Sequence, residues 1–235
     1  GFALSKSGFD NEIIITLLIA IFLAVLIPVI GYNFLKHKIG RYDAAAISAT
    51  YGSVSAVTFI AAGQFLNNNS ISYGGHMAAA MALMESPAII VAIFFGNRAS
   101  MYDKKKKNTT PTSTLIGESL KDGAQLLLIG AMVVGFMSGE NGEKVMAPFS
   151  IDLFKGMLAF FLLDMGLQVA KNLKTILNKS KFLILYAVIS PPIHALMALA
   201  LAKLFNVPMG DAVLLMVLAA SASYIAVPAA LKYSI

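Results

Sequence analysis

Long apolar runs separated by short polar stretches dominate the pattern along the 235 residues of this chain. Most runs approach the roughly 20 residues that an α-helix needs to cross the hydrocarbon core of a bilayer. None alternates apolar and polar positions as the strands of a membrane barrel would. The pattern predicts an all-α integral membrane protein with about seven spans, at 13–35, 44–65, 77–95, 124–137, 153–169, 182–205 and 212–231. The fourth run is short unless it recruits residues 115–120.

Composition supports lipid as the solvent. Hydrophobic residues make up 58% of the chain and charged residues 13%, whereas a soluble domain is about one quarter charged. Cysteine is absent, which excludes disulfides and thiolate metal sites. The net charge of +6 would normally suggest nucleic acid as a partner, but the basic residues lie in short loops between apolar runs, where they serve membrane topology.

The loop charges predict an orientation. Of the 18 Lys and Arg residues, 14 fall in the loops after the first, third and fifth runs or after the last run. The four others are Lys6, Lys144, Lys155 and Lys203. By the positive-inside rule, this alternation places the Lys-rich loops in the cytoplasm and Gly1 outside, in a multi-pass protein of the cell (inner) membrane.

Residues 98–122 form a Lys-rich stretch with four consecutive lysines, Lys104–Lys107, followed by Thr, Ser and Pro. This composition predicts a flexible cytoplasmic linker that anchors topology. The alternative is a docking site for a regulator or for anionic lipid.

A repeated pattern appears on the second and seventh runs. Asp43-Ala44 is followed ten residues later by Ser53-Val54-Ser55, and Asp211-Ala212 is followed at the same spacing by Ser221-Ala222-Ser223. Because the copies lie five spans apart, they cross the membrane in opposite directions. This is the inverted-topology repeat of many secondary transporters.

The repeat suggests a domain organisation. Residues 1–97 would be the last three helices of a first five-helix unit, and 98–122 the linker. Residues 123–170 would be scaffold-type helices and 171–235 core helices of the second unit. We therefore expect two further helices before Gly1 and one after Ile235 in an intact 5+5 protein.

Small and hydroxyl residues occupy the middle of both repeated runs. Gly52, Ser53, Ser55 and Thr58 lie in the first copy, and Ser221, Ser223 and Pro228 in the second. Serine competes for backbone hydrogen bonds and proline cannot donate one, so we expect interrupted helices here. Freed carbonyls could hold sodium and helix N-termini could attract an anion. Close helix packing is the alternative explanation for one such cluster, and the matched second copy favours a site.

Charged residues within a membrane are costly, so each is a functional candidate. Glu85, beside Ser86 and Pro87 in the third run, is the strongest, as a sodium ligand, a proton carrier or a buried partner of a hydroxyl or of His194. Asp43 and Asp211 stand at span entrances, where helix N-capping explains them. Asp164 lies inside the fifth run and could face water.

Two histidines are expected to have structural and not functional roles. His194 follows Ser190-Pro191-Pro192 and is expected to be a hydrogen-bonded packing residue, and His76 is expected at the membrane interface. The chain has no His-Glu-x-x-His zinc motif, no phosphate-binding Gly-rich loop and no Gly-x-Ser-x-Gly nucleophile setting. These absences favour a protein that is not an enzyme and has no cofactor other than a coupling ion.

At the paired serine motifs the sequence resembles the cyanobacterial sodium-dependent bicarbonate transporter family and its broader bacterial relatives. The similar segments are 43–62, 82–91, 165–166, 190–194 and 218–231. The resemblance implies ten helices in two inverted units, with bicarbonate and sodium bound between the second and seventh runs of this chain. The implied substrate-binding residues are Gly52, Ser53, Ser55, Ser221, Ala222 and Ser223, and the implied sodium-binding residues are Ser55, Thr58, Glu85 and Ser223. It also implies a homotrimer and a PII-like cytoplasmic regulator.

The chain departs from the family pattern after the second serine pair. Where the cyanobacterial members carry an acid and then Gly-Pro-Pro, this chain has Tyr224, Ala226, Val227 and Pro228. Asp164 replaces an apolar residue of the pattern, and Glu85 stands where those members have an Asp. The substrate is therefore expected to be bicarbonate or a similar small anion.

Three functional hypotheses follow. The first is sodium-coupled symport of a small anion across the bilayer. The second is a proton-coupled or organic-anion carrier of the same architecture, with Glu85 as its proton site. The third is a membrane receptor or sensor that signals through its Lys-rich loop without transport.

Overall fold

The computed structural model of the chain describes residues 10–102, 123–174 and 180–223. Every regular element in these ranges is helical. The elements are α2 (Asn11–Leu35), α3 (Arg41–Gly52), α4 (Ala56–Asn68), α5 (His76–Tyr102), α7 (Gly123–Ala147), the π-helix η1 (Pro148–Leu153), α8 (Phe154–Lys171), α10 (Lys181–Leu204) and α11 (Met209–Ala220). The expected all-α class is confirmed.

Four described helical segments are long and apolar enough to cross a membrane: Asn11–Leu35, Arg41–Asn68, His76–Ala99 and Lys181–Leu204. They coincide with the first, second, third and sixth expected runs. The apolar helix α11 is shorter, and residues 224–231 of the seventh run lie outside the described residues. The full count of seven spans stays a prediction.

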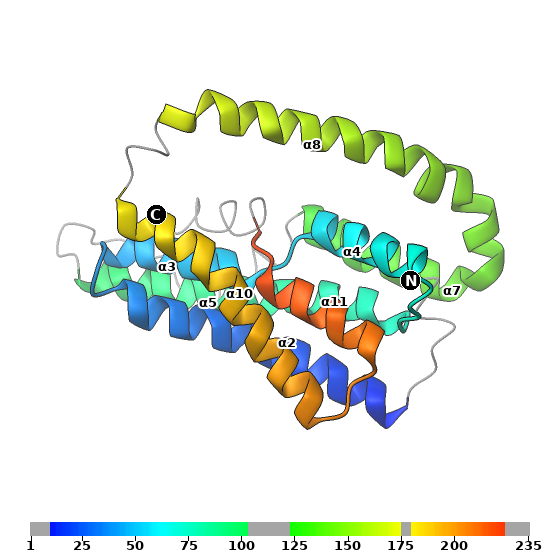
Figure 1. Cartoon of the computed structure of the whole chain (residues 1–235), viewed down its shortest axis with the longest axis horizontal. Helices are drawn as coiled ribbons and strands as arrows, with labels where there is room; N and C mark the ends of the chain where they lie inside the picture. The colour runs from blue at the N-terminus through cyan, green and yellow to red at the C-terminus, as the bar shows by residue number, and fades with distance from the viewer. Residues whose placement is uncertain (1–9, 103–122, 175–179, 224–235) are drawn as a thin grey trace.

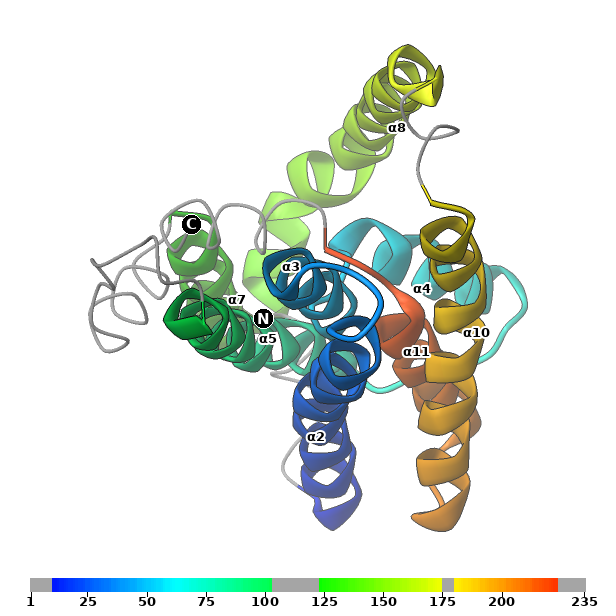
Figure 2. The same cartoon turned by 90° about the vertical axis from the view of Figure 1, so that its left-hand side faces the viewer.

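The expected fourth and fifth runs fall in α7 and α8, and the segment between these runs is helical as well. Residues 123–171 are helical without an intervening loop, and the helix bends at Gly139. The φ of Gly139 is 55°, a positive value that glycine adopts more easily than other residues. Glu, Lys, Met and Ala between Gly142 and Pro148 favour helix and explain the missing loop. In Figures 1 and 2 α8 extends away from the other helices.

The core lies where α2, α5 and α11 meet. Leu23 and Ile27 of α2, Met84 of α5, and Leu214 and Leu218 of α11 are almost fully buried in one cluster. Alanines between them let the helices approach closely, as is common in membrane bundles. A second cluster joins α2, α3 and α5, and includes the stacked rings of Tyr32 and Phe95, with centroids 4.1 Å apart.

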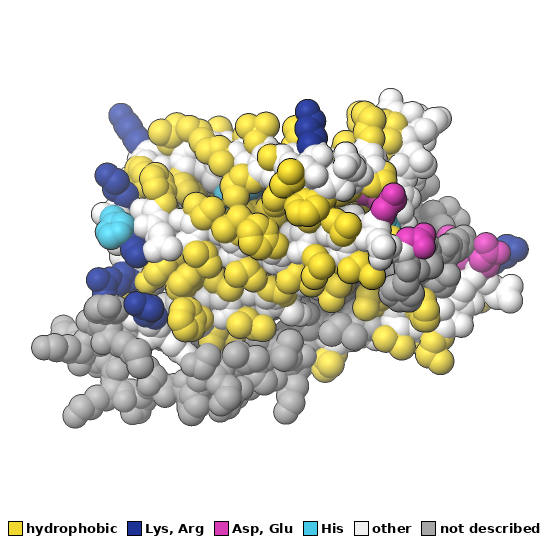
Figure 3. Space-filling view, turned by 90° about the horizontal axis from the view of Figure 1, so that it is seen from below, with side chains coloured by type: hydrophobic (Ala, Val, Ile, Leu, Met, Phe, Trp, Pro, Cys, Tyr) yellow, Lys and Arg dark blue, Asp and Glu magenta, His cyan; other side chains and the backbone are white. Residues whose placement is uncertain are grey.

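The long helices run between two chemically different ends of the molecule. Figure 3 shows most of the visible Lys and Arg side chains at the left end and the Asp and Glu side chains towards the right, with apolar side chains between. Lys36, Lys38 and Lys181 belong to loops or helix ends at the basic end, and Glu12 begins α2 at the other. The described basic and acidic side chains thus lie mostly towards opposite ends of the helices (Figure 3), and which end faces the cytoplasm stays a prediction.

Candidate functional site: two helix breaks that cross

The first helix break separates α3 from α4 at Ser53-Val54-Ser55. Ser53 has φ −90° and ψ 165°, and Ser55 has φ −112° and ψ 113°, so both are extended. Two serines around a β-branched valine, directly after a glycine, form a sequence with weak helix preference. Ser55 restarts the helix as its N-cap: its Oγ accepts from the Thr58 amide at 3.4 Å. The predicted interruption of this span is confirmed.

The second break follows α11. The helix ends at Ala220, and Ser221 is extended with φ −73° and ψ 164°. The Ser221 hydroxyl donates to the carbonyl of Leu218 at 2.8 Å and so uses its proton within the last turn. Its oxygen keeps free electron pairs that can accept a bond from elsewhere in the fold.

The two breaks are joined directly. The Ser55 amide donates to Ser221 Oγ at 3.1 Å, and the Ser223 amide donates to the carbonyl of Thr50 at 2.9 Å. Two segments far apart in the chain therefore satisfy each other's backbone groups, as buried irregular backbone requires. Figure 1 shows α3 and α11 reaching this crossing from opposite ends of the molecule, with α4 leaving it.

The crossing is buried and holds one hydroxyl without a partner. Ser53, Ser55, Ser221 and Ser223 are 0%, 7%, 7% and 5% exposed. Among the described residues, Ser53 Oγ has no hydrogen-bond partner. A buried polar group without a partner is rare because it loses its bonds to water, and it is a candidate to bind a ligand.

Helix dipoles meet at the crossing with both signs. α3 and α11 end there, which brings two sets of C-terminal carbonyls with partial negative charge. α4 begins there at Ala56, which brings N–H groups with partial positive charge. The arrangement can stabilise a cation beside the two C-termini and an anion beside the N-terminus.

The structure brings together four of the residues expected in the site, the serines of both breaks. Ala222 lies half-buried between two of them. Gly52 has a packing role instead: a Cβ there would lie 2.3 Å from Pro28 Cγ, so only glycine lets α2 and α3 approach at this point. Thr58 is exposed in the first turn of α4, and its hydroxyl donates to the Ser55 carbonyl at 2.9 Å.

Glu85 lies half-buried on α5, next to Met84 of the main core cluster, and interacts with a neighbouring residue. Its assignment as a sodium ligand or a proton carrier stays a prediction. Asp164 is exposed on α8, where it accepts a hydrogen bond from Gln168 at 2.8 Å.

An aromatic group beside the first break escaped the sequence reasoning. Tyr51 packs edge-to-face against Tyr186 and His194 of α10, with centroids 5.7 Å apart in both pairs. The position of Tyr51 directly before Gly52, at the helix break, was the only sequence feature that pointed to a role for this residue. His194 is a buried packing residue as expected, but its Nδ1 has no hydrogen-bond partner in the described part of the chain.

The interpretation of Asp43 and Asp211 as helix N-caps was wrong. Gly40 and Pro208 occupy the N-cap positions of α3 and α11, and the two aspartates lie inside the first turns. Carboxylates in the first turn stabilise a helix through its dipole. The aspartates therefore do mark the starts of the two helices, but from inside the first turn and not from the N-cap position. His76, at the start of α5, is 5% exposed, and its expected position at the membrane interface stays a prediction.

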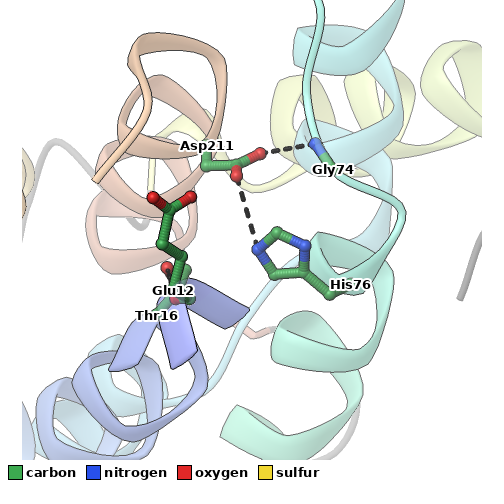
Figure 4. A network of polar contacts seen from close by, with 5 residues as sticks. All are labelled: Glu12, Thr16, Gly74, His76 and Asp211. Atoms are coloured by element: carbon green, nitrogen blue, oxygen red, sulfur yellow. Dashed lines mark hydrogen bonds and ion pairs between the residues drawn. The ribbon is translucent and has the colours of Figure 1, made fainter. Parts of the chain in front are cut away.

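Asp211 instead ties α11 to the loop before α5 (Figure 4). Its Oδ1 accepts from the Gly74 amide at 2.6 Å, and its Oδ2 lies 3.4 Å from His76 Nε2. The His76 nitrogens make no hydrogen bond within the described ranges. The contact between His76 and Asp211 is therefore a close approach whose geometry does not meet that of a hydrogen bond. Glu12 and Thr16 of α2 lie in the same corner.

Comparison with known proteins identifies the family. The described residues hold no group of three or more His, Cys, Asp or Glu side chains that could bind a metal ion. A search of curated protein sequences gives no match. A family model described as the Na⁺-dependent bicarbonate transporter superfamily matches residues 1–235, the whole chain. The chain, with its apolar helices and polar break, is a membrane protein that belongs to the Na⁺-dependent bicarbonate transporter superfamily.

Proposed function

We propose that this chain takes part in sodium-coupled transport of bicarbonate or a similar small anion, and that both ions bind at the crossing of the two helix breaks. The observation that carries the proposal is the buried hydroxyl of Ser53 between two broken helices, which has no hydrogen-bond partner in the described part of the chain. Family membership supports the same class of cargo. The opposite approach of α3 and α11 supports the inverted repeat of such carriers.

The sodium half of the site would use oxygen atoms. Sodium is a hard cation that carbonyl and hydroxyl oxygens coordinate, and the ends of α3 and α11 supply both. Ser53 Oγ is the hydroxyl that no bond within the described fold occupies. Ser55, Thr58, Glu85 and Ser223 are the further sodium ligands that we propose from the resemblance.

The anion half would use the start of α4. The first N–H groups of a helix lack partners within it, and their partial positive charge favours an anion. Ser55 and Ser221 already bond each other and frame this position. A bound sodium would lower the cost of placing an anion nearby; coupling between two sites is typically about 1–3 kcal/mol, or 5- to 150-fold in affinity. The two ions would then bind cooperatively.

The test is uptake of labelled bicarbonate by sealed vesicles that contain the full-length protein. We expect accumulation with an inward sodium gradient and none when potassium replaces sodium. Ser53→Ala should lower the apparent sodium affinity at least several-fold. Ser138→Ala is the matched control, because Ser138 is a serine outside the crossing whose hydroxyl bonds the Val134 carbonyl within its own helix.

Other results would reject parts of the proposal. Uptake that follows a proton gradient and ignores sodium would favour a proton-coupled carrier. Binding of bicarbonate without any uptake would favour a sensor. Sodium-driven uptake of small carboxylates but not of bicarbonate would keep the class and change the substrate. Unchanged sodium affinity in Ser53→Ala would move the site away from the crossing.

A further inference from the structure

A groove between α2 and α5 combines apolar walls with a basic rim. Its volume is about 490 Å³. Val29 of α2 and Ile90 and Phe94 of α5 line its walls, and the last two are 39% and 52% exposed. The stacked rings of Tyr32 and Phe95 line it as well, so part of the lining is a fixed, closely packed surface.

The rim carries a cation from each helix. Lys36 closes α2, and Arg98 lies on α5 close to its end, both among the residues that line the groove. Lys36 Nζ is held in place: it donates to Asn33 Oδ1 at 2.6 Å and lies 5.7 Å from the centre of the Tyr32 ring. Asn33 in turn donates to the Val29 carbonyl at 2.9 Å. The ammonium group is thus oriented before any ligand arrives.

We propose that this groove binds an anionic phospholipid, with its phosphate between Lys36 and Arg98 and an acyl chain along the apolar wall. The groove lies between two helices long and apolar enough to span a bilayer, and its rim lies where α2 ends, beside the segment that carries Lys38 and Arg41. Basic pockets between membrane helices at the cytoplasmic surface are suited to anionic headgroups.

The charge of the rim selects the occupant. The chain's own Lys104–Lys107 tract follows α5 and carries the same sign as Lys36 and Arg98, so repulsion disfavours it as the occupant. A soluble phosphate would satisfy the cations but leave the apolar wall facing water. A zwitterionic lipid would fill the wall but add its own positive charge near the rim. An anionic lipid satisfies both parts.

The experiment measures lipid retained by the purified full-length protein after detergent washing, by mass spectrometry, from equal mixtures of phosphatidylglycerol and phosphatidylcholine. We expect the wild type to prefer phosphatidylglycerol by about 25-fold, since each of the two basic residues near the membrane surface contributes about fivefold. Lys36→Gln/Arg98→Gln should reduce this preference to below about threefold. Phe94→Ala, which leaves the charge unchanged, should lower retention of phosphatidylglycerol several-fold.

The matched control is Lys38→Gln/Lys181→Gln, which removes the same charge from two exposed lysines at the same end, outside the groove. It should keep the wild-type preference. An equal loss in the control would show general surface attraction and overturn the proposal. Soluble glycerol phosphate that displaces the lipid at equal affinity would also overturn it, because the apolar wall would then contribute nothing. Transport activity is not the readout, so this result is independent of the proposed function.

Discussion

The serines of the two helix breaks differ in what their hydroxyl groups do within the fold. The Ser221 hydroxyl bonds both the Leu218 carbonyl and the Ser55 amide, whereas the Ser53 hydroxyl has no hydrogen-bond partner in the described structure. Removing a hydroxyl that is hydrogen-bonded within the fold should lower stability. Removing a buried hydroxyl that has no partner until a ligand binds should leave stability unchanged or raise it. Alanine substitution therefore distinguishes a structural serine from a binding serine.

We expect Ser221→Ala to destabilise the protein by about 1–3 kcal/mol, because the buried Ser55 amide would lose its acceptor. Ser53→Ala should leave stability unchanged or raise it by about 1 kcal/mol, because it removes a buried group that lacks a bond. Thermal unfolding in detergent measures both. Equal destabilisation by the two variants would contradict the hydrogen bonds described at the crossing.

Gly52 tests the packing behind the first break. Gly52→Ala would place a methyl group 2.3 Å from Pro28 Cγ and 3.0 Å from the Ala24 carbonyl, and should cost about 1–3 kcal/mol by forcing α2 from α3. Adding Pro28→Ala should restore part of this loss. Gly166→Ala is the control, since nothing lies within 4 Å of its added carbon. Thermal unfolding of the three variants is the measurement, and a loss in Gly166→Ala equal to that in Gly52→Ala would contradict the steric explanation.

At the scale of the elements, α11 is fastened at both ends. Its last residues cross the first break, and Asp211 in its first turn bonds the loop between α4 and α5. The approach at this end is close: a Cβ on Gly210 would lie 2.0 Å from the Ser72 carbonyl oxygen. A shift of α11 would therefore move the loop and the crossing together.

Substitutions at Asp211 separate its two contacts. Asp211→Asn keeps an oxygen for the Gly74 amide and should lose less than about 1 kcal/mol, whereas Asp211→Ala removes the acceptor and should lose about 1–3 kcal/mol. Hydrogen exchange at the Gly74 amide should quicken in the alanine variant only. Asp164→Ala, at an exposed carboxylate, is the control. Equal exchange in the asparagine and alanine variants would show that charge, not the amide bond, holds the loop.

The helix breaks could be predicted because they depend on neighbouring residues in the sequence. Contacts between residues distant in the chain could not be predicted. Gly52, Ser53 and Ser55 weaken a helix whatever surrounds them, so the interruption was correctly expected. The partner of Asp211, the packing of Tyr51 on α10 and the position of His76 depend on residues more than 100 positions away. The apolar pattern also misjudged 138–152, because helix formers and a bend at Gly139 replaced the expected loop.

For the whole molecule, large apolar side chains remain uncovered on the arm formed by α7, η1 and α8. Met137 is 81% exposed and Phe160 75% exposed. Faces of this kind require lipid or another protein surface. The trimer and the PII-like regulator that the family resemblance implies stay predictions, and the exposed apolar side chains of this arm are one place where such an assembly could form.

The separation of charge predicts which end faces the cytoplasm. Because these 235 residues contain no cysteine, a single introduced cysteine reports the orientation without labelling of other sites in this sequence. We expect Asn69→Cys to react with a membrane-impermeant maleimide in intact cells and Lys38→Cys to react only after permeabilisation, a nearly all-or-none difference. Full labelling of both after permeabilisation is the control. The reverse pattern would invert the orientation.

The bond between Ser55 and Ser221 joins residues 166 positions apart. Ribosomes add about 5–20 residues per second, so the first break enters the membrane roughly 10–30 s before its partner has been synthesised. During that interval its backbone groups need a temporary acceptor, for which water or the insertion machinery is available. A nascent chain released before residue 221 would carry this unpaired kink permanently.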